Sequence, residues 1–215
     1  MATRSFSFTP GEFYHVYNRG NDKRIIFDGE EDKVRFQKLL YLCNGTKSLD
    51  LRELPSGPAY EYNIGKPLTA IGAYALMDNH YHLLLKELEP GGISHFMLKL
   101  GTSHSMYFNL KYERTGRLFE GTFKGKHVTD DRHLKYLFAY IHLNPTDLLQ
   151  RSPSKKSPEL TLEELKKYPY SSYQDHLGSW RDAKQILSLE DFPQYFSNTK
   201  EYESEMLDWL TFSEG

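Results

Sequence analysis

Cysteine is almost absent from this sequence of 215 residues, which contains Cys43 and no other. A single thiol excludes a disulfide within the chain and any zinc site built on a Cys-x-x-Cys pair. We therefore expect a reducing compartment and a core that is stable without disulfides. Cys43 lies in an apolar stretch with helical spacing, FQKLLYLC at residues 36–43, which favours a core position over a nucleophile.

Long hydrophobic runs are also missing. No stretch approaches the roughly 20 apolar residues that a membrane-spanning helix needs. The first residues, MATRSF, lack the apolar segment of a secretory signal. The expectation is a cytoplasmic protein with no membrane partner.

A strong excess of one charge is lacking too, because the formal net charge is −2. The charge is unevenly placed: residues 152–215 carry seven Lys/Arg against twelve Asp/Glu, which leaves 20 against 17 for the first 151 residues. Basic side chains of the first part suit a phosphate backbone, although an ordinary solvated face would show the same pattern. The candidates for DNA contacts are Arg19, Lys111, Arg114, Arg117, Lys124 and Lys126.

Aromatic residues are abundant by contrast, with 16 Tyr and 13 Phe. Rings set in a positive groove stack the bases of single-stranded nucleic acid. Most rings of a globular protein nevertheless belong to its core. Composition alone leaves both uses open.

Hydrophobic periodicity predicts elements in the order βαββαβα. Strands are expected at residues 13–20, 68–77, 80–88 and 117–128, and helices at 30–44, 93–112 and 132–144. This order indicates an α+β fold, a ferredoxin-like antiparallel sheet with helices packed on one face. Residues 1–150 are expected to form this domain. A polar linker at 151–158 then opens a C-terminal helical extension over residues 151–215, packed on or linked to that domain.

The pair His80 and His82 is the most informative feature of the chain. Alternate residues of a strand share a face, so these two imidazoles can present themselves to one point. Two neutral imidazoles are half of a divalent metal site, with room for one more protein ligand and a substrate oxygen. Two strand histidines satisfied by hydrogen bonds would show the same pattern.

A second group of candidates lies on the last predicted helix. Tyr136, Tyr140 and Asn144 are spaced at i, i+4 and i+8 and share one helix face. A tyrosine beside a metal ion can attack a phosphodiester and form a 5′-phosphotyrosyl intermediate with a free 3′-hydroxyl. A core role for Tyr140 and a C-cap role for Asn144 are the simpler interpretations.

Three segments in chain order carry a family resemblance: MDNHYHLLL at residues 77–85, GRLFEGTFK at 116–124 and YIHLNP at 140–145. With YHVYNRG at 14–20 and YPYSSY at 168–173, they resemble the IS200-like, single-tyrosine HUH transposases, especially the branch associated with repetitive extragenic palindromes. The resemblance implies a metal pair at His80 and His82, a third ligand at Asn144 and a nucleophile at Tyr140. It also implies a Mg²⁺ or Mn²⁺ cofactor and a single-stranded DNA substrate recognised through a hairpin.

Some features depart from that family pattern. Tyr81 is bulkier than the aliphatic residue usual between the histidines, and Asp78 replaces a common proline. Tyr136 and Tyr140 also match the Tyr-x-x-x-Tyr spacing of two-tyrosine HUH proteins, but the IHLNP that follows favours one nucleophile. Two alternative functions remain open: a domesticated DNA-binding protein without catalysis, and a metal-dependent hydrolase. The sequence does not show whether the protein is a monomer or a homodimer.

Overall fold

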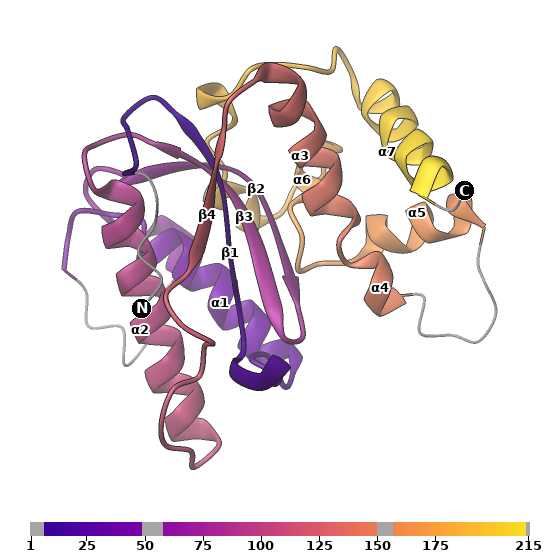
Figure 1. The fold of residues 1–215 in the computed structure, drawn as a ribbon. Helices are drawn as coiled ribbons and strands as arrows, with labels where there is room; N and C mark the ends of the chain where they lie inside the picture. The colour runs from indigo at the N-terminus through magenta and orange to yellow at the C-terminus, as the bar shows by residue number, and fades with distance from the viewer. Residues whose placement is uncertain (1–6, 49–57, 150–156, 214–215) are drawn as a thin grey trace.

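The chain is built around one antiparallel sheet. The computed structural model describes residues 7–48, 58–149 and 157–213. The central elements are β1 (Phe13–Arg19), α1 (Glu30–Leu42), β2 (Thr69–Met77), β3 (His80–Glu87), α2 (Gly92–Lys111), β4 (Lys124–Val128) and α3 (Asp131–Leu143) (Figure 1). Their order is the βαββαβα order that the sequence predicts. Within these described ranges, no helix has the length and apolar character needed to cross a membrane.

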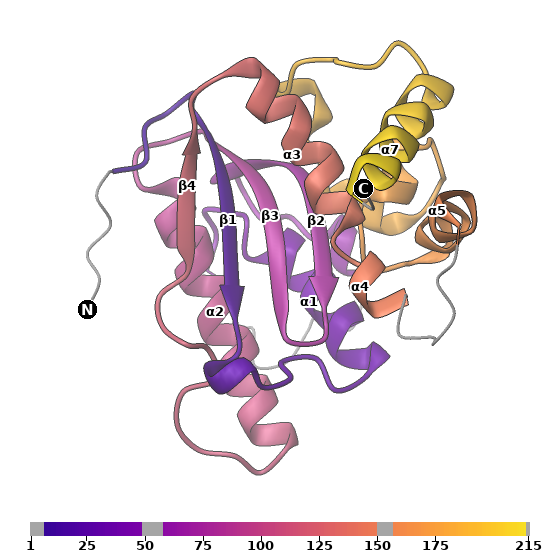
Figure 2. The same ribbon diagram turned by 45° about the vertical axis from the view of Figure 1, so that its right-hand side comes forward.

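The four strands lie in the order β2-β3-β1-β4, and every pairing is antiparallel. Figure 2 shows them side by side, with α1 and α2 behind the sheet. The helical connections from β1 to β2 and from β3 to β4 give this order its ferredoxin-like topology. The expected α+β fold class is confirmed.

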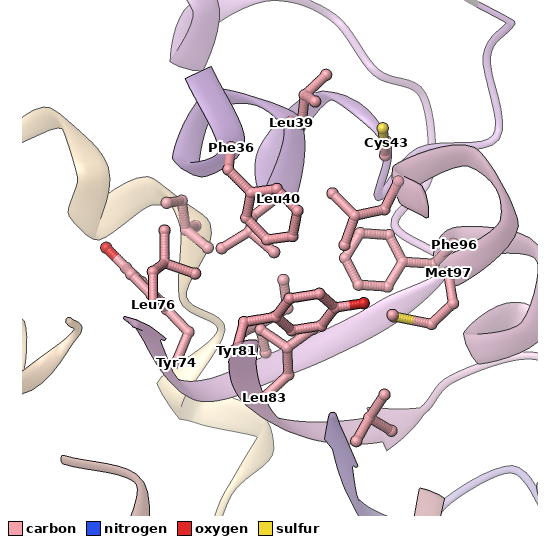
Figure 3. Close-up of a cluster of buried hydrophobic side chains, with 14 of the residues drawn as sticks. Phe36, Leu39, Leu40, Cys43, Tyr74, Leu76, Tyr81, Leu83, Phe96 and Met97 are labelled. Carbon is pink, nitrogen blue, oxygen red and sulfur yellow. The ribbon is translucent and has the colours of Figure 1, made fainter. Parts of the chain in front are cut away.

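The main core fills the face of the sheet under α1 and α2. Figure 3 shows its centre, where Tyr74, Leu76, Tyr81 and Leu83 of the sheet meet Phe36, Leu39 and Leu40 of α1 and Phe96 and Met97 of α2. Tyr81 is 1% exposed, and its ring centroid lies 5.0 Å from that of Phe36. Strand alternation then puts the histidines on either side of Tyr81 on the opposite face. Cys43 is buried in this core, and burial raises the pKa of its thiol to about 12.

The opposite face is covered on its β2 side by α3, and the C-terminal helix α7 (Thr199–Ser213) packs against α3 (Figure 2). β2 presents Ala70, Ala73 and Ala75 there, and these small side chains give α3 room to pack closely. The expectation of helices on one face therefore holds for α1 and α2 but not for α3. The physical reason is that all nine residues of β2 are buried, and a strand buried on both sides needs cover on both faces.

The C-terminal part of the chain closes the β2 edge of the sheet. Ser171 forms an antiparallel bridge with Ala75, and backbone hydrogen bonds join residues 170–172 to Tyr74 and Leu76. This contact covers peptide groups that an edge strand would otherwise expose. The remaining helices are η1 (Asn21–Lys23), η2 (Ala59–Glu61), α4 (Thr146–Leu149), α5 (Pro158–Lys167), α6 (Tyr173–His176), η3 (Asp182–Ile186) and η4 (Leu189–Asp191). The expected linker falls mostly on residues 150–156, outside the described residues.

The strand expected over residues 117–128 is shorter in the structure. Pairing with β1 runs only from Lys124, opposite Tyr17, to Val128, opposite Phe13. Leu118 and Phe119 are instead buried in the main core. These two adjacent apolar side chains anchor the loop before β4 in the core, so they do not mark a strand.

Candidate active site

The register of the sheet places both histidines on the face that α3 partly covers. His80 lies opposite Arg19 of β1, and His82 lies opposite Tyr17. On the other side of β1, Lys124 of β4 is the partner of Tyr17. Directly paired residues share a face of a sheet, so these five side chains lie on one face.

His82 is held by a histidine of the neighbouring strand. Its Nδ1 atom lies 2.7 Å from Nε2 of His15, and the two rings stack with their centroids 5.0 Å apart. Burial is the main reason that the pKa of His82 falls to about 2 and that of His15 to about 4. Both imidazoles are therefore neutral near pH 7, and one of them donates the hydrogen bond that they share.

His80 is held by its sequence neighbour Asn79. The Nδ2 atom of Asn79 donates to the carbonyl of Lys23, 3.1 Å away, which turns the amide oxygen toward Nδ1 of His80 at 2.7 Å. An amide oxygen only accepts, so Nδ1 of His80 carries the proton and Nε2 carries the lone pair. Burial and the nearby Arg19 guanidinium lower the pKa of His80.

Tyr140 faces the histidines from α3. Its ring centroid lies 5.6 Å from the centroids of both His82 and His15, in edge-on contacts. Tyr140 is 36% exposed, so it is a surface tyrosine rather than a core one. The structure thus brings a solvent-accessible phenol and the histidine pair to one place.

Asn144 connects the end of α3 with His80. Its Nδ2 atom donates to the carbonyl of Tyr140 at 2.8 Å, in the C-cap role that the sequence offered as an alternative. A hydrogen bond also joins the Asn144 and His80 side chains. Nδ1 of His80 is engaged with Asn79, so this contact uses Nε2, and the amide group of Asn144 is the donor because its Nδ2 atom carries a second hydrogen. Asn144 therefore caps the helix and reaches the histidine at the same time.

These side chains are of the kinds that could hold a divalent cation. The Nδ1 atoms of both histidines are engaged, which leaves their Nε2 atoms to bind an ion. In the described part of the chain, no three His, Cys, Asp or Glu side chains come together as a metal cage. The amide oxygen of Asn144 is then the third donor that the geometry offers. Amide oxygens suit Mg²⁺ and Mn²⁺, while imidazole nitrogens favour the transition metal of the two.

The basic side chains predicted for DNA contacts divide into two groups. Arg19, Lys124 and Lys126 lie on the histidine face, all exposed, with Lys126 opposite His15. Arg117 is exposed in the loop that precedes β4. Arg19, Lys124 and Lys126 form a positive border beside Tyr17, and the role of all four side chains in binding DNA stays a prediction.

Lys111 and Arg114 are not brought to this border. The Lys111 ammonium lies 2.8 Å from the carboxylate of Asp32, which is fully buried between α1 and α2. The Arg114 guanidinium lies over the ring of Phe108, 5.8 Å from its centroid. Both side chains are engaged at the end of α2, on the side of the sheet away from the histidines.

The helix α7 reaches the neighbourhood of Tyr140. The Trp209 ring centroid lies 4.7 Å from that of Tyr136, which in turn lies 5.8 Å from that of Tyr140. An ion pair of 2.8 Å between Lys135 and Glu205 ties the two helices together. Burial raises the pKa of Tyr136. Tyr136 is thus packed against α7, whereas Tyr140 faces the histidines.

Sequence reasoning missed three side chains of the site. His15 shares the alternation of YHVYNR in β1 with Tyr17 and Arg19, and this pattern was the signal that could have found it. Asn79 adjoins the histidine pair, but its bond to the Lys23 carbonyl depends on the fold. Trp209 gives no local signal at all.

No protein-family model matches the chain, and no curated protein matches it in sequence. Among solved structures, a REP-associated tyrosine transposase bound to a REP hairpin is similar to it, with a TM-score of 0.53 and 10% sequence identity. The match covers 92% of this chain and 100% of that chain. At this identity the likeness shows a common fold.

Proposed function

We propose that the protein is a single-stranded DNA strand transferase that cleaves and rejoins DNA through a tyrosine nucleophile. The observation that carries the proposal is the convergence of Tyr140 with His82, at 5.6 Å between ring centroids, on the same face as His80. The shared fold with a tyrosine transposase bound to a REP hairpin supports the same function. Two of the three sequence segments that resemble HUH transposases, residues 77–85 and 140–145, supply these same residues.

The reaction follows from the chemistry of a phenol next to a phosphodiester. The Tyr140 oxygen forms a bond to phosphorus as its proton leaves, and the bond from phosphorus to the 3′ oxygen breaks. That oxygen takes up a proton, which leaves a free 3′-hydroxyl and a 5′-phosphotyrosyl bond. The reverse reaction with another 3′-hydroxyl rejoins DNA without an external energy source.

His80, His82 and Asn144 are proposed to hold a Mg²⁺ or Mn²⁺ ion. When bound, the ion would neutralise charge on the non-bridging phosphate oxygens. The chain itself keeps both imidazoles neutral by burial, and it orients them through Asn79 and His15. These contacts prepare the ligands before the ion arrives.

Hairpin DNA is the proposed substrate. The neighbouring solved structure holds a REP hairpin, and the histidine face of this chain carries exposed Arg19, Lys124 and Lys126. Such a border binds phosphates irrespective of sequence. The half-buried ring of Tyr17 lies between the border and His82, where it could stack on a base.

The test is a search for the covalent adduct. The protein is incubated with labelled hairpin single strands and Mn²⁺, and the products are separated under denaturing conditions. We expect a labelled protein band that is absent in Tyr140→Phe, although this variant still binds the hairpin. Hairpin binding without any adduct in the unmodified protein would instead support a DNA-binding protein without catalysis.

Tyr136→Phe is the matched control, because it removes the same hydroxyl one helical turn away. Tyr136 is packed against Trp209, so this variant should keep the adduct. Adduct that persists in Tyr140→Phe and disappears in Tyr136→Phe would overturn the assignment of the nucleophile. A free 5′-phosphate without adduct would favour hydrolysis by activated water.

A further inference from the structure

His15 contacts both halves of the site. It is 5% exposed, and its ring lies against those of His82 and Tyr140, with centroid distances of 5.0 Å and 5.6 Å. Its Nε2 atom is 2.7 Å from Nδ1 of His82, the ring atom that faces away from the proposed ion. The function proposed above uses His15 to orient the His82 ring but does not say which of the two donates the hydrogen bond.

The two site histidines are held by different kinds of partner. The amide oxygen of Asn79 can only accept, so it fixes one tautomer of His80. The Nε2 atom of a neutral imidazole can either donate or accept. If His15 donated, His82 would carry its own proton on Nε2 and could not bind an ion there. If His15 accepts, the Nε2 lone pair of His82 is free.

We propose that His15 is a positioning residue that accepts a hydrogen bond from Nδ1 of His82 and so keeps the Nε2 lone pair of His82 available to the ion. The inference rests on the proposed function. It adds a third histidine to the site, one that orients a ligand without binding the ion itself. Partners of this kind commonly change metal affinity by about 10- to 100-fold when they are removed.

Two variants separate the hydrogen bond from the packing. His15→Phe keeps a ring against His82 and Tyr140 but has no acceptor. His15→Gln loses the ring, but its side-chain amide reaches about as far as Nε2 and offers an oxygen to Nδ1 of His82. A role in packing alone predicts the larger defect in His15→Gln, and a role in positioning predicts it in His15→Phe.

The first measurement needs no metal. Nitrogen-15 NMR of the histidine side chains distinguishes protonated from unprotonated ring nitrogens. We expect His82 protonated at Nδ1 in the unmodified protein and in His15→Gln, and a mixture of tautomers in His15→Phe. A proton on Nε2 of His82 in the unmodified protein would overturn the inference even if the proposed function is correct.

The second measurement is Mn²⁺ binding by calorimetry, with unfolding curves to verify that each variant is folded. His15→Phe should weaken binding by at least about 10-fold, and His15→Gln should restore most of it. If Mn²⁺ bound His15→Phe as tightly as the unmodified protein but did not bind His80→Ala, the role of His15 would be overturned and the metal site would stand. Absence of Mn²⁺ binding in the unmodified protein would overturn the metal site and this inference with it.

Discussion

The Lys111 ammonium and the Asp32 carboxylate form an ion pair of 2.8 Å in which Asp32 has no exposed surface. The carboxylate also accepts hydrogen bonds from Tyr107 and Tyr112, each at 2.9 Å. Lys111 therefore compensates a buried charge between α1 and α2. This position explains why a basic residue that suits DNA binding by sequence is not part of the positive border.

Lys111→Met should destabilise the protein by about 2 to 4 kcal/mol, because it leaves the Asp32 charge buried with fewer partners. Lys126→Met on the exposed strand β4 is the control and should change stability by less than about 0.5 kcal/mol. Urea unfolding of the two variants measures both effects. Equal stability of the variants would show that the ion pair is dispensable.

Removal of the positive border should weaken hairpin binding in a salt-dependent way. Arg19→Ala, Lys124→Ala and Lys126→Ala together should reduce the slope of log affinity against log salt by about 0.7 for each phosphate that the protein no longer neutralises. Lys184→Ala, which removes an exposed charge on η3, should leave the slope unchanged. Titrations of the protein with hairpin DNA at several salt concentrations measure the slope. An unaltered slope in the triple variant would mean that the positive border is an ordinary solvated face.

Stability should fall with acid partly through His104. Its Nε2 atom bonds to the Ile26 carbonyl at 2.8 Å, whereas Nδ1 is buried without a partner among the described residues. Burial lowers the pKa of His104 from 6.5 to about 4. The unfolded chain takes up this proton as the pH falls through 6.5, but the folded chain does so only near 4. The contribution to stability is therefore complete above pH 6.5 and is lost between 6.5 and 4.

His104→Gln retains a donor for Ile26 and does not titrate. The loss of unfolding free energy between pH 7 and pH 4.5 should be smaller in this variant by about 2 kcal/mol. Urea unfolding of both proteins at the two pH values measures these losses. The other buried histidines contribute equally to both proteins, so their effect cancels in the comparison. Identical losses in both proteins would contradict the assignment to His104.

Gly72 should not tolerate a side chain, because a Cβ atom there would lie 2.7 Å from the ring of Phe192. Gly72→Ala should destabilise the protein by about 1 to 3 kcal/mol through overpacking. The smaller side chain of Phe192→Leu should recover part of this loss in the double variant. Gly121→Ala is the control, because nothing lies within 4 Å of its Cβ position. Thermal unfolding of these variants beside the unmodified protein is sufficient to test this.

Local pattern predicted much of the fold and of the site. Alternation placed His80 and His82 on one face with Tyr81 on the other, and helical spacing put Tyr140 and Asn144 on one side of α3. The stop at Pro145 and the N-cap at Asp130, whose side chain accepts from the His133 amide at 2.8 Å, set the ends of that helix. All of these features depend on residues close together in the chain.

Long-range pairing could not be predicted in the same way. His15 and His82 meet because β1 and β3 pair in one particular register across 67 positions of sequence. The ion pair of Lys111 with the buried Asp32 and the contact of Trp209 with Tyr136 depend on how helices pack. Composition likewise could not show that α3 lies on the face opposite α1 and α2.

Because β3 has two different faces, it should tolerate substitutions better than insertions or deletions over evolutionary time. One residue inserted or deleted between the turn at Asn79 and Leu83 would exchange the faces, turning histidines into the apolar interior and Tyr81 toward the face that α3 partly covers. A single replacement changes one side chain and leaves the register of the strand intact. Lineages of this protein should therefore accept substitutions in this strand more readily than a change in its length.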